Sequence, residues 1–190
     1  MNSLLRSFLV FGATLAVTGG SAQAQSFPGK PIRIIIPFTA GGTNDILART
    51  LGPKLSEALG QPVIVDNRPG GNTVIASQAL LASDKDGHTL LLPGNSHVVV
   101  PHLTKERLPF DSIKDFQPVA TLARTGLFLV VTPSLPAADL KEFIALAKAK
   151  PGELNSAAPG GSINQLATEM FNSVAGVKLV HIPYKGSAPA

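Results

Sequence analysis

The chain contains no cysteine and no tryptophan, and it has one tyrosine among its 190 residues. Without cysteine, disulfides, thiol nucleophiles and thiolate metal sites are all excluded. The scarcity of aromatic residues removes the stacking platform that single-stranded nucleic acids require. The 16 Lys and Arg residues, set against 12 acidic ones, also form no clustered basic stripe. The sequence therefore predicts no nucleic-acid partner.

Motifs of catalysis and of cofactor binding are missing as well. No two of the four histidines are four residues apart or have a zinc-type carboxylate partner: they are His88, His97, His102 and His181. The chain has no Gly-x-Ser-x-Gly elbow, no Gly-x-Gly-x-x-Gly motif and no phosphate-loop lysine. We therefore predict no metal site, no cofactor and no catalytic residue. An exported enzyme that acts on an acidic substrate is the less favoured alternative.

The N-terminus has the pattern of a secretory signal peptide. Arg6 precedes a mostly apolar stretch, residues 8–17, which is too short to span a bilayer. The tetrapeptide Ser21-Ala22-Gln23-Ala24 has the small residues of a cleavage site. We expect residues 1–24 to be removed by cleavage after Ala24, and the mature chain to be exported.

A β-branched run followed by a glycine pair and an amphipathic helix forms the first candidate binding site. Residues 32–36 predict a strand that Pro37 ends, and the pair Gly41-Gly42 then precedes a helix with Thr43 or Asn44 as its cap. The first N–H groups of a helix lack intrahelical partners, and the helix dipole favours a carboxylate or phosphate beside them. An ordinary capped turn is the alternative interpretation.

Strand and helix signals alternate along the first half of the chain, which predicts an α/β fold with mostly parallel strands. Residues 63–66 and 89–92 are expected strands, with a helix over residues 73–83 between them. These strands end at loops 67–71 and 93–96. Because the carboxyl ends of parallel strands meet at one edge of a sheet, we expect these loops and the first glycine pair to share a rim.

The second half of the chain repeats this design. We expect strand character over residues 119–131, where the chain crosses to a second lobe, then a helix over residues 137–149 and a strand over residues 154–157. The pair Gly160-Gly161 precedes a further helix. That helix carries an apolar stripe of Leu166, Met170 and Val174. Two helix starts with paired glycines predict a ligand held by backbone donors from two lobes.

The C-terminal residues predict elements beyond the end of the sequence. Residues 178–182 are an expected strand, and Gly186-Ser187-Ala188-Pro189 has the pattern of a helix start, yet the sequence ends at Ala190. We therefore expect the sequence to be part of a longer protein, with an incomplete second lobe. One alternative is that this chain is a non-functional fragment of that protein.

Four passages across the mature chain have a joint pattern that is specific to one family. They are Pro37–Gly42 with Asp45–Arg49, Asn67–Gly70, Leu108–Asp111 with Lys114–Phe116, and Pro183–Pro189. This pattern resembles the periplasmic solute-binding receptors of tripartite tricarboxylate transporters, the Bordetella uptake gene family. The chain departs from the family pattern at Asn72 and Thr73, where glycine is usual, and at Gln165, where histidine is frequent. These positions bear on the choice of ligand.

The resemblance implies a type II periplasmic binding fold, in which two α/β lobes with mostly parallel sheets close around a small carboxylate. Residues 25–124 would form the first lobe and residues 125–190 an incomplete second one. The implied function is a periplasmic receptor that delivers its ligand to the membrane permease subunits of a transporter. The implied ligand-binding residues form three walls: Phe38, Ala40, Gly41, Gly42, Thr43, Asn44 and Asp45; Gly94, Asn95 and Ser96; and Gly160, Gly161, Ser162 and Gln165 with Tyr184 and Lys185.

Several of these residues also have a structural interpretation. Asp45 falls in the first turn of its helix and can pair with Arg49, which favours a structural role. Ser96 and Ser162 can donate to a carboxylate or satisfy loop backbone, and the glycine pair before Ser162 favours ligand contact there. Lys185 can supply charge to an acidic ligand or remain solvated.

Overall fold

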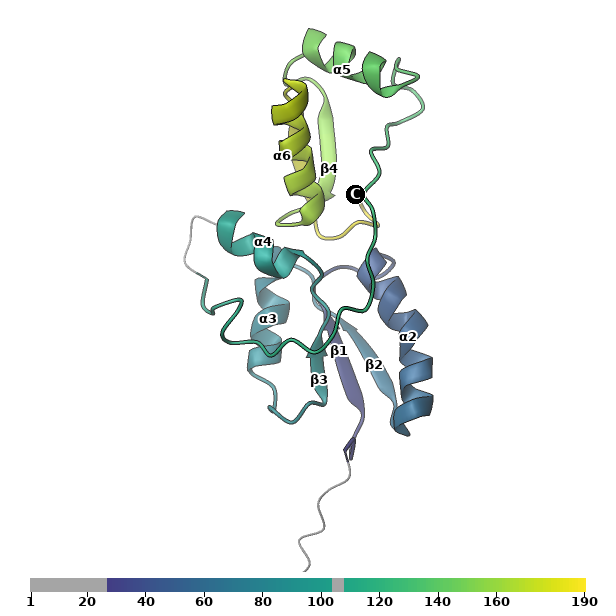
Figure 1. Cartoon of the computed structure of the whole chain (residues 1–190), viewed down its shortest axis with the longest axis vertical. Coiled ribbons are helices and arrows are strands. Elements are labelled where there is room, and N and C mark those ends of the chain that lie inside the picture. The colour runs from purple at the N-terminus through teal and green to yellow at the C-terminus, as the bar shows by residue number, and fades with distance from the viewer. Residues whose placement is uncertain (1–26, 104–107) are drawn as a thin grey trace, which may run out of the picture.

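The chain folds into two units, each built on its own parallel β-sheet (Figure 1). The computed structural model describes residues 27–103 and 108–190. The first unit contains β1 (Ile32–Ile36), α2 (Thr43–Leu59), β2 (Val63–Asn67), the 3₁₀ helix η1 (Gly71–Thr73), α3 (Val74–Leu81), β3 (Thr89–Leu91) and α4 (Ser96–Leu103). The second unit contains α5 (Leu140–Ala149), β4 (Asn155–Pro159), α6 (Ile163–Ala175) and β5 (Val180–Tyr184).

Strand β1 lies at the centre of the first sheet, between β2 and β3, and both pairings are parallel. Ile34 is in register with Val65 on one side and with Leu90 on the other. The isoleucines of β1 are buried, as expected for a central strand that is covered on both faces. The predicted α/β fold is confirmed, and the carboxyl ends of all three strands share one edge, as the sequence indicated.

The start of α2 differs from the expectation. Its N-cap is Gly42, which offers no side chain, so the prediction of Thr43 or Asn44 as the cap is wrong. The reason lies in the Asn44 side chain, whose Nδ2 donates to the carbonyl of Leu92 at 2.9 Å. Asn44 therefore ties α2 to the loop after β3, and the N-terminus of the helix is left without a side-chain partner.

The second unit has a small core of its own. Phe143 and Ala147 of α5 are buried with Leu179, and the ring of Phe143 stacks on that of Phe171 from α6 at a centroid distance of 5.9 Å. Helix α6 has no buried residue. Its expected apolar stripe is exposed, at Leu166, Met170 and Val174.

Helix α5 begins later than predicted. Asp139 is its N-cap and accepts the backbone N–H of Glu142 at 2.8 Å, while the Glu142 carboxylate accepts the N–H of Ala138 at 2.8 Å. This reciprocal capping fixes the first helical residue at Leu140, three positions after the expected start. The strand expected over residues 178–182 is present as β5, displaced by two residues.

The expected strand character of residues 119–131 is wrong. These residues form no helix or strand and run as a long connection from the first unit to the second (Figure 1). Phe128 and Val130 expose 89% and 82% of their surface. A β-branched, aromatic run becomes a strand only when it pairs with a neighbour, and neither described sheet pairs with this segment.

The expected signal peptide, residues 1–24, lies outside the described residues and stays a prediction. Among the residues that are described, no helix is both long enough and apolar enough to cross a membrane.

Candidate functional site

The carboxyl ends of the two sheets face each other where the units meet (Figure 1). The backbone N–H of Thr39, after β1, donates to the carbonyl of Lys185, after β5, at 3.4 Å. Gly186 follows directly, and a side chain there would collide with the hydroxyl of Thr39. The two units, called lobes from here on, therefore touch through the loops that end β1 and β5.

The first predicted wall is the loop between β1 and α2. Gly41 has a φ of +83°, and its N–H donates to Oδ2 of Asp45 at 2.9 Å. Nε of Arg49 donates to the same carboxylate at 3.0 Å, which confirms the predicted pairing of Asp45 and Arg49. The Arg49 guanidinium, followed by the Gly41 N–H, lowers the pKa of Asp45, whose side chain is 5% exposed. Asp45 therefore shapes the loop as a charged group.

The N-terminus of α2 is left open by this arrangement. No side chain caps it, because the Asn44 amide bonds to Leu92 and the Asp45 carboxylate bonds to Gly41. The N–H groups of its first turn have no intrahelical partners, and the dipole of a 17-residue helix adds partial positive charge there. This end of the helix lies at the junction of the lobes and is suited to an anion (Figure 1).

The second predicted wall, Gly94 to Ser96, lies against the first. A methyl group on Gly94 would be 3.2 Å from Nδ2 of Asn44, so the two loops are in contact. Ser96 begins α4 and is 3% exposed. The structure brings this wall beside the N-terminus of α2 but keeps it outside the cavity described below.

The third predicted wall repeats the turn of the first. The N–H of Gly161 donates to Oε1 of Gln165 at 2.9 Å, as Gly41 does to Asp45. The Ser162 hydroxyl donates to the carbonyl of Pro159 at 2.6 Å and accepts the N–H of Gln165 at 3.3 Å. In this conformation the hydroxyl caps α6, and its ligand contact stays a prediction.

A cavity of about 50 Å³ lies between the lobes at this point. It is lined by residues from both lobes: Pro37, Phe38, Gly70, Asn72, Thr73, Pro159, Gly160, Tyr184 and Lys185. Phe38, Gly160, Tyr184 and Lys185 belong to the predicted site. The loop from Gly70 to Thr73 was not among the predicted site residues. It follows β2 and lies on the same rim as the first wall, and this position is the signal by which the sequence could have identified it.

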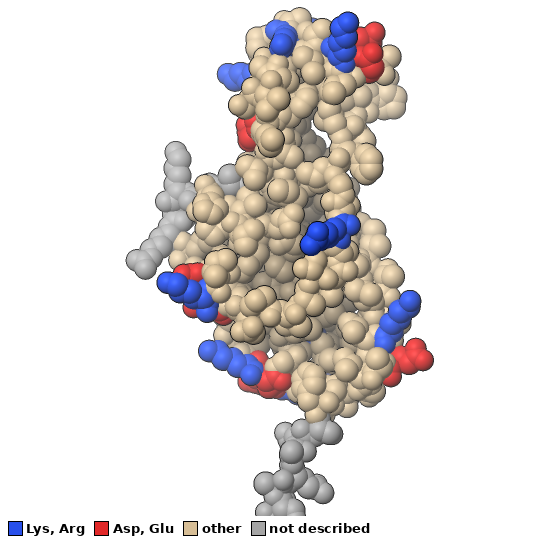
Figure 2. Space-filling view, viewed as in Figure 1, with Lys and Arg blue, Asp and Glu red and all other residues tan. Residues whose placement is uncertain are grey.

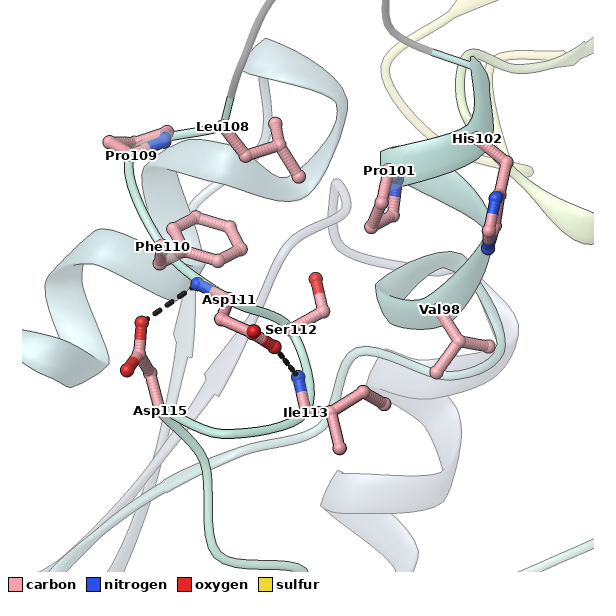
Figure 3. Close-up of a pocket in the computed structure, with 10 residues that line it drawn as sticks. All are labelled: Val98, Pro101, His102, Leu108, Pro109, Phe110, Asp111, Ser112, Ile113 and Asp115. Carbon is pink, nitrogen blue, oxygen red and sulfur yellow. Dashed lines mark hydrogen bonds between the residues drawn. The ribbon is translucent and has the colours of Figure 1, made fainter.

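A larger cavity of about 1060 Å³ lies between α4 and residues 108–115 (Figure 3). Its two carboxylates stabilise the loop: Asp115 accepts the N–H of Asp111 at 2.7 Å, and Asp111 accepts those of Ile113 and Lys114 at 2.9 and 3.0 Å. These bonds lower the pKa of Asp111 and keep it charged. Two carboxylates on the lining disfavour an anion, so the junction of the lobes is the better candidate for an anion site.

The charge distribution agrees with that choice. On the face shown in Figure 2, most charged side chains lie on the outer parts of the two lobes, and the surface between the lobes carries a basic group without an acidic one beside it. Within residues 27–103 and 108–190, no group of three or more His, Asp or Glu side chains is arranged to hold a metal ion.

Two α/β lobes that meet at the carboxyl ends of their sheets, with an open helix N-terminus at the junction, define the periplasmic-binding-protein fold. The chain belongs to the tripartite tricarboxylate transporter family of receptors, whose family model matches residues 47–190. This family and its solved members are binding proteins, so the alternative of an enzyme is set aside.

Curated relatives are longer than this chain. It is 41% identical to a UPF0065 protein of Bordetella bronchiseptica, over all of the chain and 56% of the relative. It is 38% identical to BugT of Bordetella pertussis, over 99% of the chain and 59% of that protein. The chain thus spans little more than half the length of these relatives.

Solved structures of similar fold include two with small acids. Rpa4515 of R. palustris with adipate has a TM-score of 0.82 and 36% identity, over 86% of this chain and 55% of that one. MatC of Rhodopseudomonas palustris with bound malate has a TM-score of 0.73 and 29% identity, over 86% of this chain and 56% of that one.

Proposed function

We propose that this chain is the ligand-capturing part of a periplasmic receptor that binds a small carboxylate between its lobes and delivers it to a membrane permease. The observation that carries the proposal is the open N-terminus of α2 at the lobe junction. A carboxylate there accepts from the unpaired N–H groups of Thr43, Asn44 and Asp45.

The second lobe brings two further features suited to an anion to the same junction, beside a cavity that residues 41–45 do not themselves line. Lys185 lines the cavity and brings a positive charge, and the N-terminus of α6 follows the glycine pair of that lobe. The two neighbours that are described with adipate and with malate support a carboxylate as the ligand class. Receptors of this shape close around their ligand by a hinge motion of the lobes.

The periplasmic location and the permease partner belong to the same proposal. The family description supports both, and the N-terminal pattern supports cleavage after Ala24. Sequencing the N-terminus of protein recovered from a periplasmic extract tests the cleavage. The expected first residue is Gln25, and retention of Met1 would contradict export by this signal.

Proline substitution at the first helical position tests the anion site directly. Thr43 is the first residue of α2 after an extended Gly42, so Thr43→Pro deletes one N–H without breaking the helix. Leu140→Pro is the matched control, because Leu140 is the first residue of α5 after an extended Asp139, at a helix that contributes no residue to the cavity.

Thermal unfolding with mono-, di- and tricarboxylates at millimolar concentration is the measurement. We expect one acid class to raise the melting temperature of the wild-type chain and of Leu140→Pro, and not that of Thr43→Pro. An equal rise in Thr43→Pro would show that the acid binds elsewhere. The lack of any cooperative transition in the wild type would instead support the fragment alternative.

A further inference from the structure

Asn72 enters the cavity between the lobes on an unusual stretch of backbone. Asn72 and Thr73 have φ values of +48° and +77°, directly after Gly70 and Gly71, which also have positive φ. Asparagine tolerates the left-handed region, but a β-branched threonine there is strained and persists only where its surroundings hold it. Thr73 is 3% exposed, so its surroundings hold this conformation, and Asn72 beside it faces the glycine pair of the second lobe.

The Asn72 side chain lies against the glycine pair of the second lobe. A methyl group on Gly160 would be 2.8 Å from Oδ1 of Asn72, and one on Gly161 would be 3.1 Å from its Cβ. Asn72 lines the junction cavity together with Phe38 and Lys185. Its carboxamide therefore occupies space that a longer ligand would need.

The carboxamide is also available for recognition. It makes no hydrogen bond to any residue that the structure describes, whereas the neighbouring loops use their polar side chains on backbone groups: Asn44, Asp45, Ser162 and Gln165. An amide presents two donors and one acceptor, so it can meet a hydroxyl or a second carboxylate close to the first.

We propose that Asn72 determines ligand specificity, disfavouring longer acids and favouring those that carry a hydroxyl or a second carboxylate near the first. This inference rests on the proposed function, because it names the ligand class of the same cleft. The volume of the side chain sets the length limit, and the carboxamide reads the second polar group.

The test compares malate, succinate and adipate by isothermal titration of the whole chain. The wild type is expected to bind malate most tightly and adipate least. Asn72→Gly suits the left-handed backbone and opens the cleft, so its preference for malate over adipate should fall by about tenfold or more. Asn72→Asp keeps the shape but adds a negative charge, so it should weaken the binding of all three acids at neutral pH by about tenfold or more.

Asn155→Gly is the matched control. It removes the same carboxamide from the end of β4 that lies away from the junction cavity, so its order of preference should match the wild type. An unchanged malate-to-adipate ratio in Asn72→Gly, an equal change in Asn155→Gly, or a wild type that prefers adipate would overturn the role of Asn72 alone. If the wild type binds none of the three acids nor any of a wider acid panel, the proposed function fails, and this inference fails with it.

Discussion

Asp45 and Gln165 occupy equivalent positions in the two lobes: each side chain accepts, at 2.9 Å, the backbone N–H of the glycine four residues before it. Gly41 and Gly161, the two donors, both have positive φ. The turn is thus built twice, once closed by a carboxylate and once by an amide. The carboxylate has in addition a cation, Arg49, as its second partner.

This difference predicts unequal costs when the two acceptors are removed. Asp45→Ala deletes charge-assisted hydrogen bonds made by a buried carboxylate, and we expect it to lower the free energy of unfolding by about 2–3 kcal/mol. Gln165→Ala deletes a neutral hydrogen bond and should cost about 1 kcal/mol. Urea unfolding of both variants measures the difference. Equal losses would show that the charge of Asp45 adds nothing to the turn.

The lowered pKa of Asp45 predicts a dependence of stability on acid. The pKa of Asp45 is lower in the native state than the value of about 3.9 of an unfolded aspartate. The ionised carboxylate therefore makes its full contribution to the free energy of unfolding above about pH 3.9, and this contribution is lost as the pH falls through the native pKa. Asp45→Asn is expected to be less stable than the wild type at pH 7, and the gap should narrow below about pH 4. Chemical unfolding from pH 7 to pH 3 measures the gap.

Other acidic groups do not obscure that comparison. The pKa of Asp111 is also lowered, by the N–H groups of Ile113 and Lys114, and it too weakens the protein in acid. This contribution is common to the wild type and Asp45→Asn, so it cancels in their difference. A gap that stays constant down to pH 3 would contradict the role given to Asp45.

Alanine substitutions at Phe128 and Phe143 test whether residues 119–131 are an unpaired connection between the lobes. Phe143 is 7% exposed and stacks on Phe171, so Phe143→Ala should cost about 3–5 kcal/mol. Phe128 is 89% exposed, and Phe128→Ala should change the free energy of unfolding by less than about 0.5 kcal/mol. A large loss for Phe128→Ala in this chain would mean that residues 119–131 do pair as the sequence predicted.

Local signals in the sequence were sufficient for much of the fold. The isoleucines of residues 32–36 identify a buried central strand, and the spacing of Asp45 and Arg49 identifies their ion pair. Both features depend on residues that are close in sequence. The shared rim also follows from local signals, because parallel strands leave little choice in where their ends meet.

The sequence does not predict helix α4, because the helix is short, at 8 residues, and contains Pro101. Two further features depend on partners that are distant in sequence. The left-handed backbone of Asn72 and Thr73 carries no glycine signal and is held by burial and by the loop of the opposite lobe. The sequence does not reveal the cap of α2, because the Asn44 side chain bonds to Leu92, which is 48 residues away.

Alanine substitutions at Gly161 and Gly60 distinguish the stability lost to backbone strain from the stability lost when the contact between the lobes is disturbed. Their φ values, +67° and +68°, are nearly equal, but a methyl group on Gly60 meets nothing within 4 Å. On Gly161 it would be 2.8 Å from Cγ2 of the buried Val100 and 3.1 Å from Cβ of Asn72, both in the first lobe.

Alanine at either glycine should therefore cost about 1–2 kcal/mol for the left-handed backbone. Gly161→Ala should lose about 1–3 kcal/mol more, because it overpacks the contact between the lobes. Urea unfolding of the two variants measures the extra loss. Equal losses would mean that the loop of Gly161 moves away from Val100 at no cost, and that the lobes are not held together at this point.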